Sequence, residues 1–458
     1  MSQLPTDGGR RAQSIDCDPA PLFHIETWGC QMNVLDGQRM AGQLESRGYH
    51  PAGQAQGCDV VLLNTCAVRE KAEAKVYSAL GVLARRKQEN PRMVIGVTGC
   101  VAQVSGEEIL ERAPWVDFVV GTGEVERIGE LVDRARKERE RERAAYLDLP
   151  QDSPTYSFAQ VSRDSSFQAY VTIIEGCDQF CTFCIVPFTR GRERSRPASD
   201  VLAELEHLAQ RGFTEVTLLG QTVNAYRDPE NGIGLGSLLR RAAGVQGIRR
   251  VRFLTSHPSF VDPELIEALA EGGAIAPYLH LPAQSGSDRV LYRMKRRYDR
   301  RRYLDVIESV RRARPDIAVS SDFIVGFPGE SEEDFSQSLE LLREARFASV
   351  FAFRYSPRPG TAAARWGSDT QVGEEVAAER LGRLLALQAR IQTEINESLV
   401  GLPLEILVEG RNRRGQITGR SPCNRVVHVQ RVAELSPGAY LTVRITKGLP
   451  NSLLAEPA

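Results

Sequence analysis

Short apolar segments recur at a nearly constant spacing along residues 21–130. Three of them, LFHIETWGC, DVVLLNTC and RMVIGVTGC, end at Cys30, Cys66 and Cys100, at intervals of 36 and 34 residues. Between them, stretches such as GQRMAGQLESRG repeat their apolar residues at helical spacing. Strand, helix and strand at this period predict βαβ units. We therefore expect an N-terminal α/β domain with an open parallel sheet over residues 21–133.

A second and longer series of apolar runs follows. Its six members are AYVTIIEG, EVTLLGQ, RVRFLTS, PYLHLPA, IAVSSDFIVGF and SVFAFRYS, with helical patterns between most of them. Six consecutive βα units predict a central partial (β/α)6 barrel over residues 161–396, open compared with the eight-stranded form. The chemistry of such a barrel is expected at the C-terminal ends of its strands.

The last segment, residues 397–458, consists of short β-rich runs separated by Gly, Pro and Asn, which predicts a small antiparallel β-barrel. It holds eight lysines and arginines against five glutamates, a net charge of +3. A small basic barrel at a chain end is typical of RNA binding, although a capping domain can have the same charge. The whole chain carries a net charge of −1, so any RNA must be held by local patches.

Two segments lack apolar periodicity. Residues 1–20 combine polar residues and prolines, which predicts a disordered tail and not a signal peptide. Residues 134–160 begin with the mixed-charge run RARKERERERAAYLD, which predicts a solvated helical linker. Apolar runs are far shorter than the roughly 20 residues that cross a bilayer. We expect a cytoplasmic multidomain protein without a membrane span, and nothing in the sequence indicates an oligomer rather than a monomer.

Three of the nine cysteines, Cys177, Cys181 and Cys184, stand within the stretch EGCDQFCTFC. Sparse thiols in a cytosolic chain are best interpreted as metal ligands or reactive groups. Their spacing also matches one stripe of a buried helix, but Gly176 and a following proline and glycine favour a loop at a strand end. Zinc would need a fourth ligand, which is absent nearby. Three thiolates instead suit a four-iron cluster with one open iron.

Cys30, Cys66 and Cys100 each end a parallel strand, so they should converge at one edge of the sheet. Three unrelated core thiols are the alternative, since cysteine is often buried in such sheets. Glycine or polar residues directly before each cysteine favour a second three-thiol cluster, whose open iron would take a non-protein ligand such as sulfur. No ligand role is predicted for the remaining cysteines, Cys17, Cys58 and Cys423.

Polar side chains near the ends of the barrel strands are candidates for cofactor binding, although each could be a satisfied loop group. They are Gln221, Asn224, Ser256, His257, Gln284 and Asp322. Four arginines between residues 190 and 196, and the run RMKRRYDRRRY at 293–303, offer phosphate contacts and stacking rings. A plain solvated face explains the second of these equally well. The sequence identifies no catalytic residue.

The motifs TWGCQMN, LLNTCAVRE, EGCDQFCTFCIVPFTRGRERSRP, LTSHP, HLPAQSGSDR and SSDFIVGFPGE closely resemble the methylthiotransferase family of the radical S-adenosylmethionine superfamily, over roughly residues 21–455. The resemblance implies a 4Fe-4S cluster on Cys177, Cys181 and Cys184, with S-adenosylmethionine on its open iron. It also implies an auxiliary 4Fe-4S cluster on Cys30, Cys66 and Cys100, and an OB-like TRAM domain at the C-terminus. Trp28 stands where many relatives have tyrosine.

The family reaction uses two molecules of S-adenosylmethionine. The resemblance implies that one donates a methyl group to sulfur at the auxiliary cluster, and that the other is cleaved to a 5′-deoxyadenosyl radical. The most similar branch installs a methylthio group on carbon 2 of N(6)-dimethylallyladenosine at position 37 of tRNA. A base in the anticodon stem-loop is accessible enough to be splayed into a pocket. An electron donor and a sulfur source are also implied, without their identities.

Three alternatives stay open at this point. Sister enzymes modify an aspartate of a ribosomal protein or threonylcarbamoyladenosine in tRNA, but TWGCQMN and IVPFTRGRERSRP resemble the dimethylallyl branch more closely. From a different class, the chain could be a zinc-dependent RNA-binding protein without chemistry. A zinc protein is colourless, so iron content and visible absorbance distinguish it from an iron–sulfur enzyme.

Overall fold

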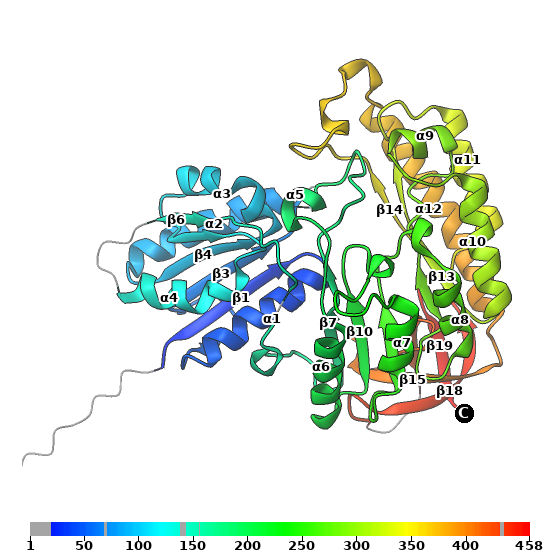
Figure 1. Cartoon of the computed structure of the whole chain (residues 1–458), viewed down its shortest axis with the longest axis horizontal. Helices are drawn as coiled ribbons and strands as arrows, with labels where there is room; N and C mark the ends of the chain where they lie inside the picture. Colours follow the sequence, from blue (N-terminus) through cyan, green and yellow to red (C-terminus); the bar gives the residue numbers. More distant parts are fainter. Residues whose placement is uncertain (1–19, 68–70, 138–142, 155, 431–434) are drawn as a thin grey trace, which may run out of the picture.

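The computed structural model describes residues 20–458 apart from 68–70, 138–142, 155 and 431–434. Cys17 and almost all of the predicted tail therefore lie outside the described residues. Figure 1 shows three units in chain order: an α/β unit in blue and cyan, a half barrel in green and yellow, and a small β-barrel in orange and red. Within the described part of the chain, no helix is long and apolar enough to cross a membrane.

The N-terminal unit is built on a six-stranded, fully parallel sheet in the order β2-β1-β3-β4-β5-β6, which confirms the expected open sheet. The three predicted strands are neighbours in it: β1 (Leu22–Trp28), β3 (Val60–Thr65) and β4 (Val94–Gly99). Strands of two or three residues carry too little periodicity to be detected from the sequence. Those missed are β2 (His50–Pro51), β5 (Phe118–Val120) and β6 (Ala144–Tyr146).

Strand β6 departs from the linker predicted for residues 134–160. Helix α4 (Ile128–Lys137) takes up the first part of that segment, and β6 then pairs in parallel with β5 at the edge of the sheet. The sequence did not predict this strand, because three residues after a charged run are too few to show an alternating pattern.

Four helices cover the two faces of this sheet. Buried Val60 and Leu62 of β3 pack with α1 and α4, whereas Val61 and Leu63 pack with α2 and α3. Successive side chains of a strand point to opposite faces, and a parallel sheet covered on both faces is apolar throughout. The helices are α1 (Gln31–Glu45), α2 (Lys71–Glu89), α3 (Cys100–Arg112) and α4.

The central unit contains all six predicted barrel strands, which pair as two parallel sheets, β11-β10-β7 and β12-β13-β14. A single parallel bridge between Val251 and Ile275 lies between β11 and β12, so the six strands form the predicted partial barrel. The strands are β7 (Gln168–Thr172), β10 (Glu215–Leu219), β11 (Arg250–Phe253), β12 (Tyr278–His280), β13 (Ala318–Val325) and β14 (Ser349–Arg354).

Helices pack around the outside of the half barrel and enclose its main hydrophobic core. Four of them begin at a capping Asp or Ser, as at Ser331, whose hydroxyl and backbone both bond Asp334 in a capping box. These helices are α6 (Ala198–Gln210), α7 (Leu235–Ala243), α8 (Pro263–Glu271), α9 (Asp288–Arg293), α10 (Arg300–Ala313), α11 (Glu332–Ala345) and α12 (Glu374–Glu397).

One excursion leaves the half barrel after β7. Strand β8 (Ile174–Glu175) pairs antiparallel with β9 (Arg194–Ser195), and helix α5 (Val186–Arg190) lies between them. The three closely spaced cysteines lie in the loop from β8 to α5. This excursion extends toward the N-terminal unit, where α5 packs against α3 (Figure 1).

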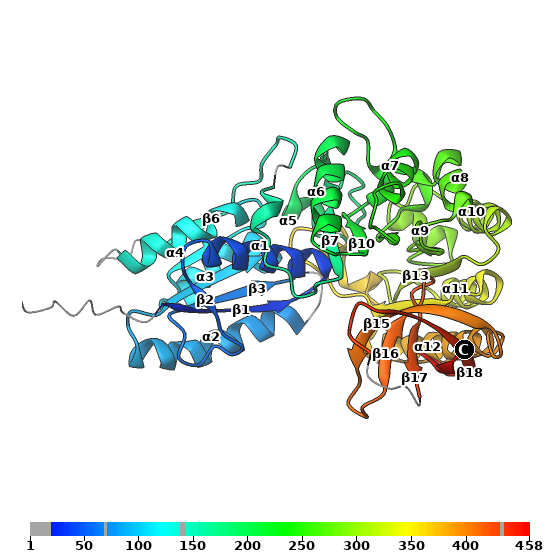
Figure 2. The same cartoon turned by 90° about the horizontal axis from the view of Figure 1, so that it is seen from below.

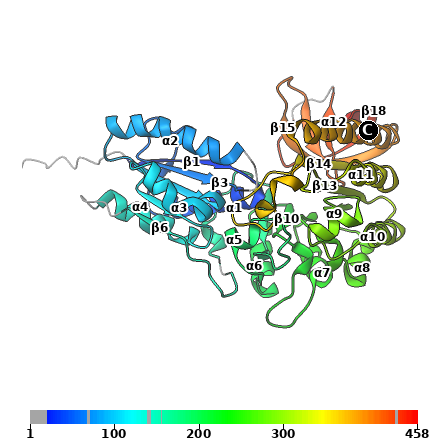
Figure 3. The ribbon, with the colours of Figure 1, turned by 90° about the horizontal axis from the view of Figure 1, so that it is seen from above.

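The C-terminal unit is a closed five-stranded barrel in the order β15-β16-β17-β19-β18. Its pairing is antiparallel, as predicted, except between β17 and β19, which are parallel. The Arg252 guanidinium joins it to β11 by donating to the carbonyls of Ser421 and Pro422, each at 2.7 Å. Figures 2 and 3 show α12 beside this barrel. Its strands are β15 (Pro403–Arg411), β16 (Ile417–Arg420), β17 (Val426–Val429), β18 (Tyr440–Gly448) and β19 (Leu453–Pro457).

Candidate metal centres

The loop with Cys177, Cys181 and Cys184 has no regular structure, as the sequence predicted. It begins at Gly176, which has a positive φ of 79° and passes so close to Arg192 that a Cβ would lie 1.9 Å from its carbonyl oxygen. Only glycine fits such a position. The backbone N–H of Gly176 donates to Oε1 of Gln221 at 2.6 Å, which ties the loop to the end of β10.

The three loop thiols lie close enough to interact with one another, and they are largely buried. Burial and the neighbouring Cys181 raise the pKa of Cys184 to about 12. Burial also raises the pKa of Cys177, although the Thr222 hydroxyl 3.3 Å from its sulfur lowers it. Ionising such thiols requires a positive group, which a metal provides because its ligands bind as thiolates.

Arg296 is the cation closest to this set. Its Nη1 donates to Sγ of Cys181 at 3.4 Å and its Nη2 to the carbonyl of Pro282 at 3.1 Å. The sequence analysis included this arginine only within a basic run, because its contact with Cys181 spans 115 positions. A fixed positive charge beside a sulfur favours the thiolate form of that sulfur.

The second set, Cys30, Cys66 and Cys100, directly follows the neighbouring strands β1, β3 and β4. Cys66 and Cys30 form a thiol hydrogen bond, which together with the charge of Arg190 lowers the pKa of Cys30 to about 6, although desolvation opposes this at a residue that remains exposed. Cys100 is close enough to interact electrostatically with Cys30, while burial raises its pKa. The sheet therefore brings these three distant positions to one edge.

Two fully buried asparagines form the base of this second set. Asn33 donates to Oδ1 of Asn64 at 3.2 Å, Asn64 donates back to the Asn33 carbonyl at 2.7 Å, and Cys30 donates to Oδ1 of Asn33 at 3.3 Å. Gly29 makes room for them, because a Cβ there would lie 2.6 Å from Oδ1 of Asn33. Both asparagines lie in sequence motifs, TWGCQMN and LLNTCAVRE, but no local pattern indicates that they pair across 31 positions.

Neither cysteine set resembles a site for a single metal ion. Among the residues that the structure describes, no three His, Cys, Asp or Glu side chains meet closely enough to share one ion. One zinc ion, with bonds of about 2.3 Å to sulfur, would draw its ligands to within roughly 4 Å of each other. A cluster of four irons is wider, and its preferred ligands are thiolates. Two sets of three soft donors therefore fit four-iron clusters, each with one iron left open.

A buried ion network joins the excursion that carries the loop cysteines to the second cysteine set. Arg190, at the end of α5, donates to Oδ2 of Asp36 at 2.6 Å and interacts with both Cys30 and Cys100. Arg39, one helical turn from Asp36 on α1, donates to Oγ1 of Thr172 at 3.1 Å. The segment from β8 to β9 thus carries the loop cysteines near its start, and through Arg190 of α5 it interacts with Cys30 and Cys100.

The six polar candidates divide into two groups. Gln221 holds the cysteine loop, while Asn224 and the backbone of His257 exchange two hydrogen bonds of 2.9 and 2.8 Å. Burial, Arg296 and Arg297 lower the pKa of His257 to about 2, so its ring is neutral near pH 7. These three side chains are engaged within the protein.

The other three polar candidates are less engaged. The buried hydroxyl of Ser256 has no hydrogen-bond partner among the described residues. Gln284 has a positive φ of 70°, and its backbone N–H donates to the Asp322 carbonyl at 2.8 Å. The Asp322 carboxylate lies 3.4 Å from Nε2 of His280 and is half-buried. Ser256 and Gln284 follow β11 and β12, whereas Asp322 lies within β13.

Three family models match successive parts of the chain. Residues 22–121 match an uncharacterised protein family, UPF0004; residues 171–342 match the radical SAM superfamily; residues 397–458 match the TRAM domain.

Curated relatives match nearly the full length. A protein of Sphingopyxis alaskensis is 47% identical over 96% of this chain and 98% of its own length. One of Streptomyces viridosporus is also 47% identical, over 97% of this chain and 89% of its own length. Both are named tRNA-2-methylthio-N(6)-dimethylallyladenosine synthase.

Solved structures share the fold at low identity. A radical S-adenosylmethionine methyltransferase of Kitasatospora setae superposes with a TM-score of 0.54 at 16% identity, over 75% of each chain. A cobalamin-dependent S-adenosylmethionine radical enzyme gives 0.51 at 14% identity, over 81% of this chain and 56% of that chain.

Proposed function

Because this chain belongs to the family of tRNA-2-methylthio-N(6)-dimethylallyladenosine synthases, we propose that its two cysteine sets cooperate in one reaction on tRNA. The chain is a radical S-adenosylmethionine methylthiotransferase that converts N(6)-dimethylallyladenosine of tRNA to its 2-methylthio derivative. In this reaction the hydrogen on carbon 2 of the base is replaced by a sulfur atom that carries a methyl group. One observation carries the proposal: the excursion that holds one set of three cysteines reaches the second set through Arg190, which interacts with Cys30 and Cys100.

Cys177, Cys181 and Cys184 would hold the 4Fe-4S cluster that the radical SAM match implies. When bound, that cluster and S-adenosylmethionine supply one-electron cleavage of a carbon–sulfur bond, which yields a radical able to abstract hydrogen. Thr222 and Arg296 orient two of the sulfurs by hydrogen bonds, and the arginine stabilises the thiolate of Cys181.

Ser256, Gln284 and Asp322 are proposed to bind S-adenosylmethionine. The unpartnered hydroxyl of Ser256 and the carboxylate of Asp322 offer an acceptor and a negative charge for a positively charged cosubstrate. Gln221, Asn224 and His257 would position these groups, since their own polar atoms are engaged with the protein.

Cys30, Cys66 and Cys100 are proposed to hold an auxiliary 4Fe-4S cluster at which sulfur is carried. The lowered pKa of Cys30 and the adjacent Arg190 support this, because both favour thiolate ligands. The relatives' name and the TRAM match indicate tRNA as the partner. An electron donor and a sulfur source are required by this chemistry.

Iron and acid-labile sulfide per chain, measured after reconstitution without oxygen, test the proposal. We expect about eight irons in the wild type and about four in either triple variant, Cys30→Ala/Cys66→Ala/Cys100→Ala or Cys177→Ala/Cys181→Ala/Cys184→Ala. The matched control is Cys58→Ala/Cys423→Ala, which should keep all eight. About four irons in the wild type, lost only with the loop cysteines, would remove the auxiliary cluster from the proposal.

A further inference from the structure

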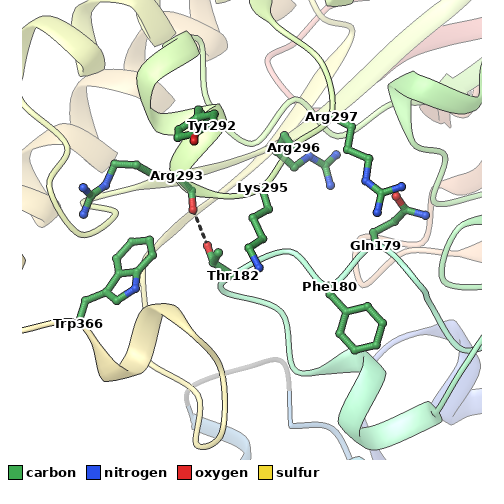
Figure 4. A pocket seen from close by; sticks show the side chains of 9 residues that line it. All are labelled: Gln179, Phe180, Thr182, Tyr292, Arg293, Lys295, Arg296, Arg297 and Trp366. Carbon is green, nitrogen blue, oxygen red and sulfur yellow. Dashed lines mark hydrogen bonds between the residues drawn. The ribbon is translucent and has the colours of Figure 1, made fainter.

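A cavity of about 720 Å³ opens directly beside the cysteine loop. Figure 4 shows its lining, which comes from three places. These are the cysteine loop, the end of α9 with the turn that follows it, and the connection between β14 and α12 at Trp366. We propose that this basic and aromatic pocket binds the single-stranded loop of the tRNA substrate next to the reacting base. The inference rests on the proposed function and adds to it the residues that contact RNA. The lining residues are Gln179, Phe180, Thr182, Tyr292, Arg293, Lys295, Arg296, Arg297 and Trp366.

The pocket is positively charged, which favours a polyanionic ligand. Four of the nine lining residues are cations and none is a carboxylate. Lys295 and Arg297 are exposed, and their side chains form no hydrogen bond or ion pair with another described residue. Glu193 interacts with Arg297 electrostatically but does not line the cavity. Such a surface attracts phosphates, whereas S-adenosylmethionine carries a sulfonium and an ammonium group that it would repel.

Aromatic rings at the rim provide stacking surfaces. Tyr292 is 84% exposed and Phe180 is 40% exposed, which is unfavourable for large apolar groups in water unless a partner covers them. The Arg293 guanidinium lies 4.7 Å from the ring centre of Trp366. Its Nε donates to the Pro328 carbonyl at 3.2 Å, which holds the guanidinium over that ring. Rings and guanidinium planes beside cations are the surface on which single-stranded bases stack.

The backbone of the pocket is strained and preformed. Phe180 and Lys295 have positive φ angles of 46° and 56°, a conformation that residues other than glycine adopt at a cost. Such strain clusters at functional sites, where the surrounding structure holds it. Here Thr182 joins the two strained segments: its hydroxyl donates to the Arg293 carbonyl at 2.9 Å and its N–H to the Met294 carbonyl at 3.1 Å (Figure 4).

The position of the pocket fits substrate binding next to the radical site. Three residues of the pocket stand between the cysteines of this loop in the sequence: Gln179, Phe180 and Thr182. A nucleotide stacked on Phe180 would therefore lie beside the loop cysteines, and its 3′ or 5′ neighbour could enter the half barrel. The pocket would hold nucleotides that flank the modified base, while the barrel holds the base itself.

Binding of a synthetic anticodon stem-loop that carries dimethylallyladenosine tests this inference on the reconstituted enzyme. Lys295→Gln/Arg297→Gln should weaken binding about tenfold and reduce the slope of log affinity against log salt by roughly 1.4, as expected for two lost phosphate contacts on a single strand. Phe180→Ala/Tyr292→Ala should weaken binding about as much without changing the slope. The control, Arg312→Gln/Arg343→Gln, removes the same charge from exposed positions outside both the pocket and the basic run, and should stay within about twofold of wild type.

Iron content per chain shows that each variant is folded and loaded. Wild-type affinity and salt slope in both pocket variants would overturn the inference and leave the proposed function intact. Weaker S-adenosylmethionine binding with unchanged RNA binding would assign the pocket to the cosubstrate and also overturn it. If the wild type neither binds nor modifies the stem-loop, the proposed function itself fails.

Discussion

His257 illustrates how a single buried side chain is constrained by its neighbours. Its Nδ1 accepts a hydrogen bond from the backbone N–H of Ser259 at 3.2 Å, and its ring packs against those of Phe260 and Tyr298. Burial, followed by the charges of Arg296 and Arg297, lowers its pKa to about 2. The folded protein therefore requires the neutral imidazole.

Acid should destabilise the fold through this residue. A depressed folded pKa contributes stability that is fully present above the unfolded value of 6.5 and is lost as pH falls toward about 2. Below pH 6.5 we expect the free energy of unfolding to fall by up to about 1.4 kcal/mol per pH unit from this group. Urea midpoints of the metal-free protein between pH 7 and 5 measure the loss.

His257→Asn should flatten that pH dependence, because asparagine keeps an acceptor for the Ser259 N–H without a titrating ring. His50→Gln is the control, since His50 is exposed on β2 and its replacement should leave the slope as in the wild type. A slope that persists in His257→Asn would assign the acid sensitivity to other groups.

At the scale of elements, the junctions of strands and helices place the cysteines. Gly99 is the last residue of β4 and directly precedes α3; its φ is 89°, and a Cβ there would lie 2.5 Å from the Thr65 carbonyl oxygen. The close approach of β4 to β3 at this point brings Cys100 beside the other two cysteines of its set. The glycine is thus required both for its conformation and for its small size.

Gly99→Ala should therefore cost more than backbone strain alone. Alanine would be strained at this φ of 89° and ψ of −160°, because essentially only glycine adopts that region, and the clash with Thr65 adds to the strain by separating the strand ends. We expect the variant to lose about four irons of the auxiliary set and to keep about four in the barrel loop.

Gly48→Ala separates the two effects. Gly48 has a similar φ of 84° but no atom within 4 Å of its Cβ position, so its replacement should bring strain without loss of iron. Equal iron content in both variants would show that the fit at Gly99 does not control the site.

At the scale of the whole molecule, one buried cation links two units. Arg190 of the barrel excursion pairs with Asp36 of α1, and both side chains are almost completely buried. Truncating one partner of a buried ion pair leaves the other charge uncompensated, at a cost of about 3–5 kcal/mol. This pair is one of the buried polar contacts between the N-terminal unit and the half barrel, beside the hydrogen bond from Arg39 to Thr172.

Arg190→Met should loosen that contact. We expect faster limited proteolysis between the N-terminal unit and the half barrel, followed by mass spectrometry of the fragments. Arg192→Met is the control, because Arg192 is two residues away but its pair with Asp178 is exposed and contributes little. Wild-type proteolysis in Arg190→Met would show that the two units are held by other contacts.

The fold could be predicted from the sequence wherever a pattern is local. Period-two and helical spacing located the strands β1, β3 and β4 and all six barrel strands, while Gly176 and its neighbours indicated the cysteine loop. Strand β6 was not predicted, because three apolar residues after a charged run are too few to show an alternating pattern. The parallel pairing of β17 with β19 was not predicted, because the direction of pairing depends on the path of the chain through space.

The sequence by itself determined the residue types and spacing of both cysteine sets, since ligand chemistry depends on thiols placed at strand ends. Only the tertiary structure decided what surrounds them. Arg190 meets Asp36 across 154 positions, and Arg296 meets Cys181 across 115. No local pattern encodes such contacts, because a side chain acquires its electrostatic neighbours only when separate elements pack together and exclude water between them.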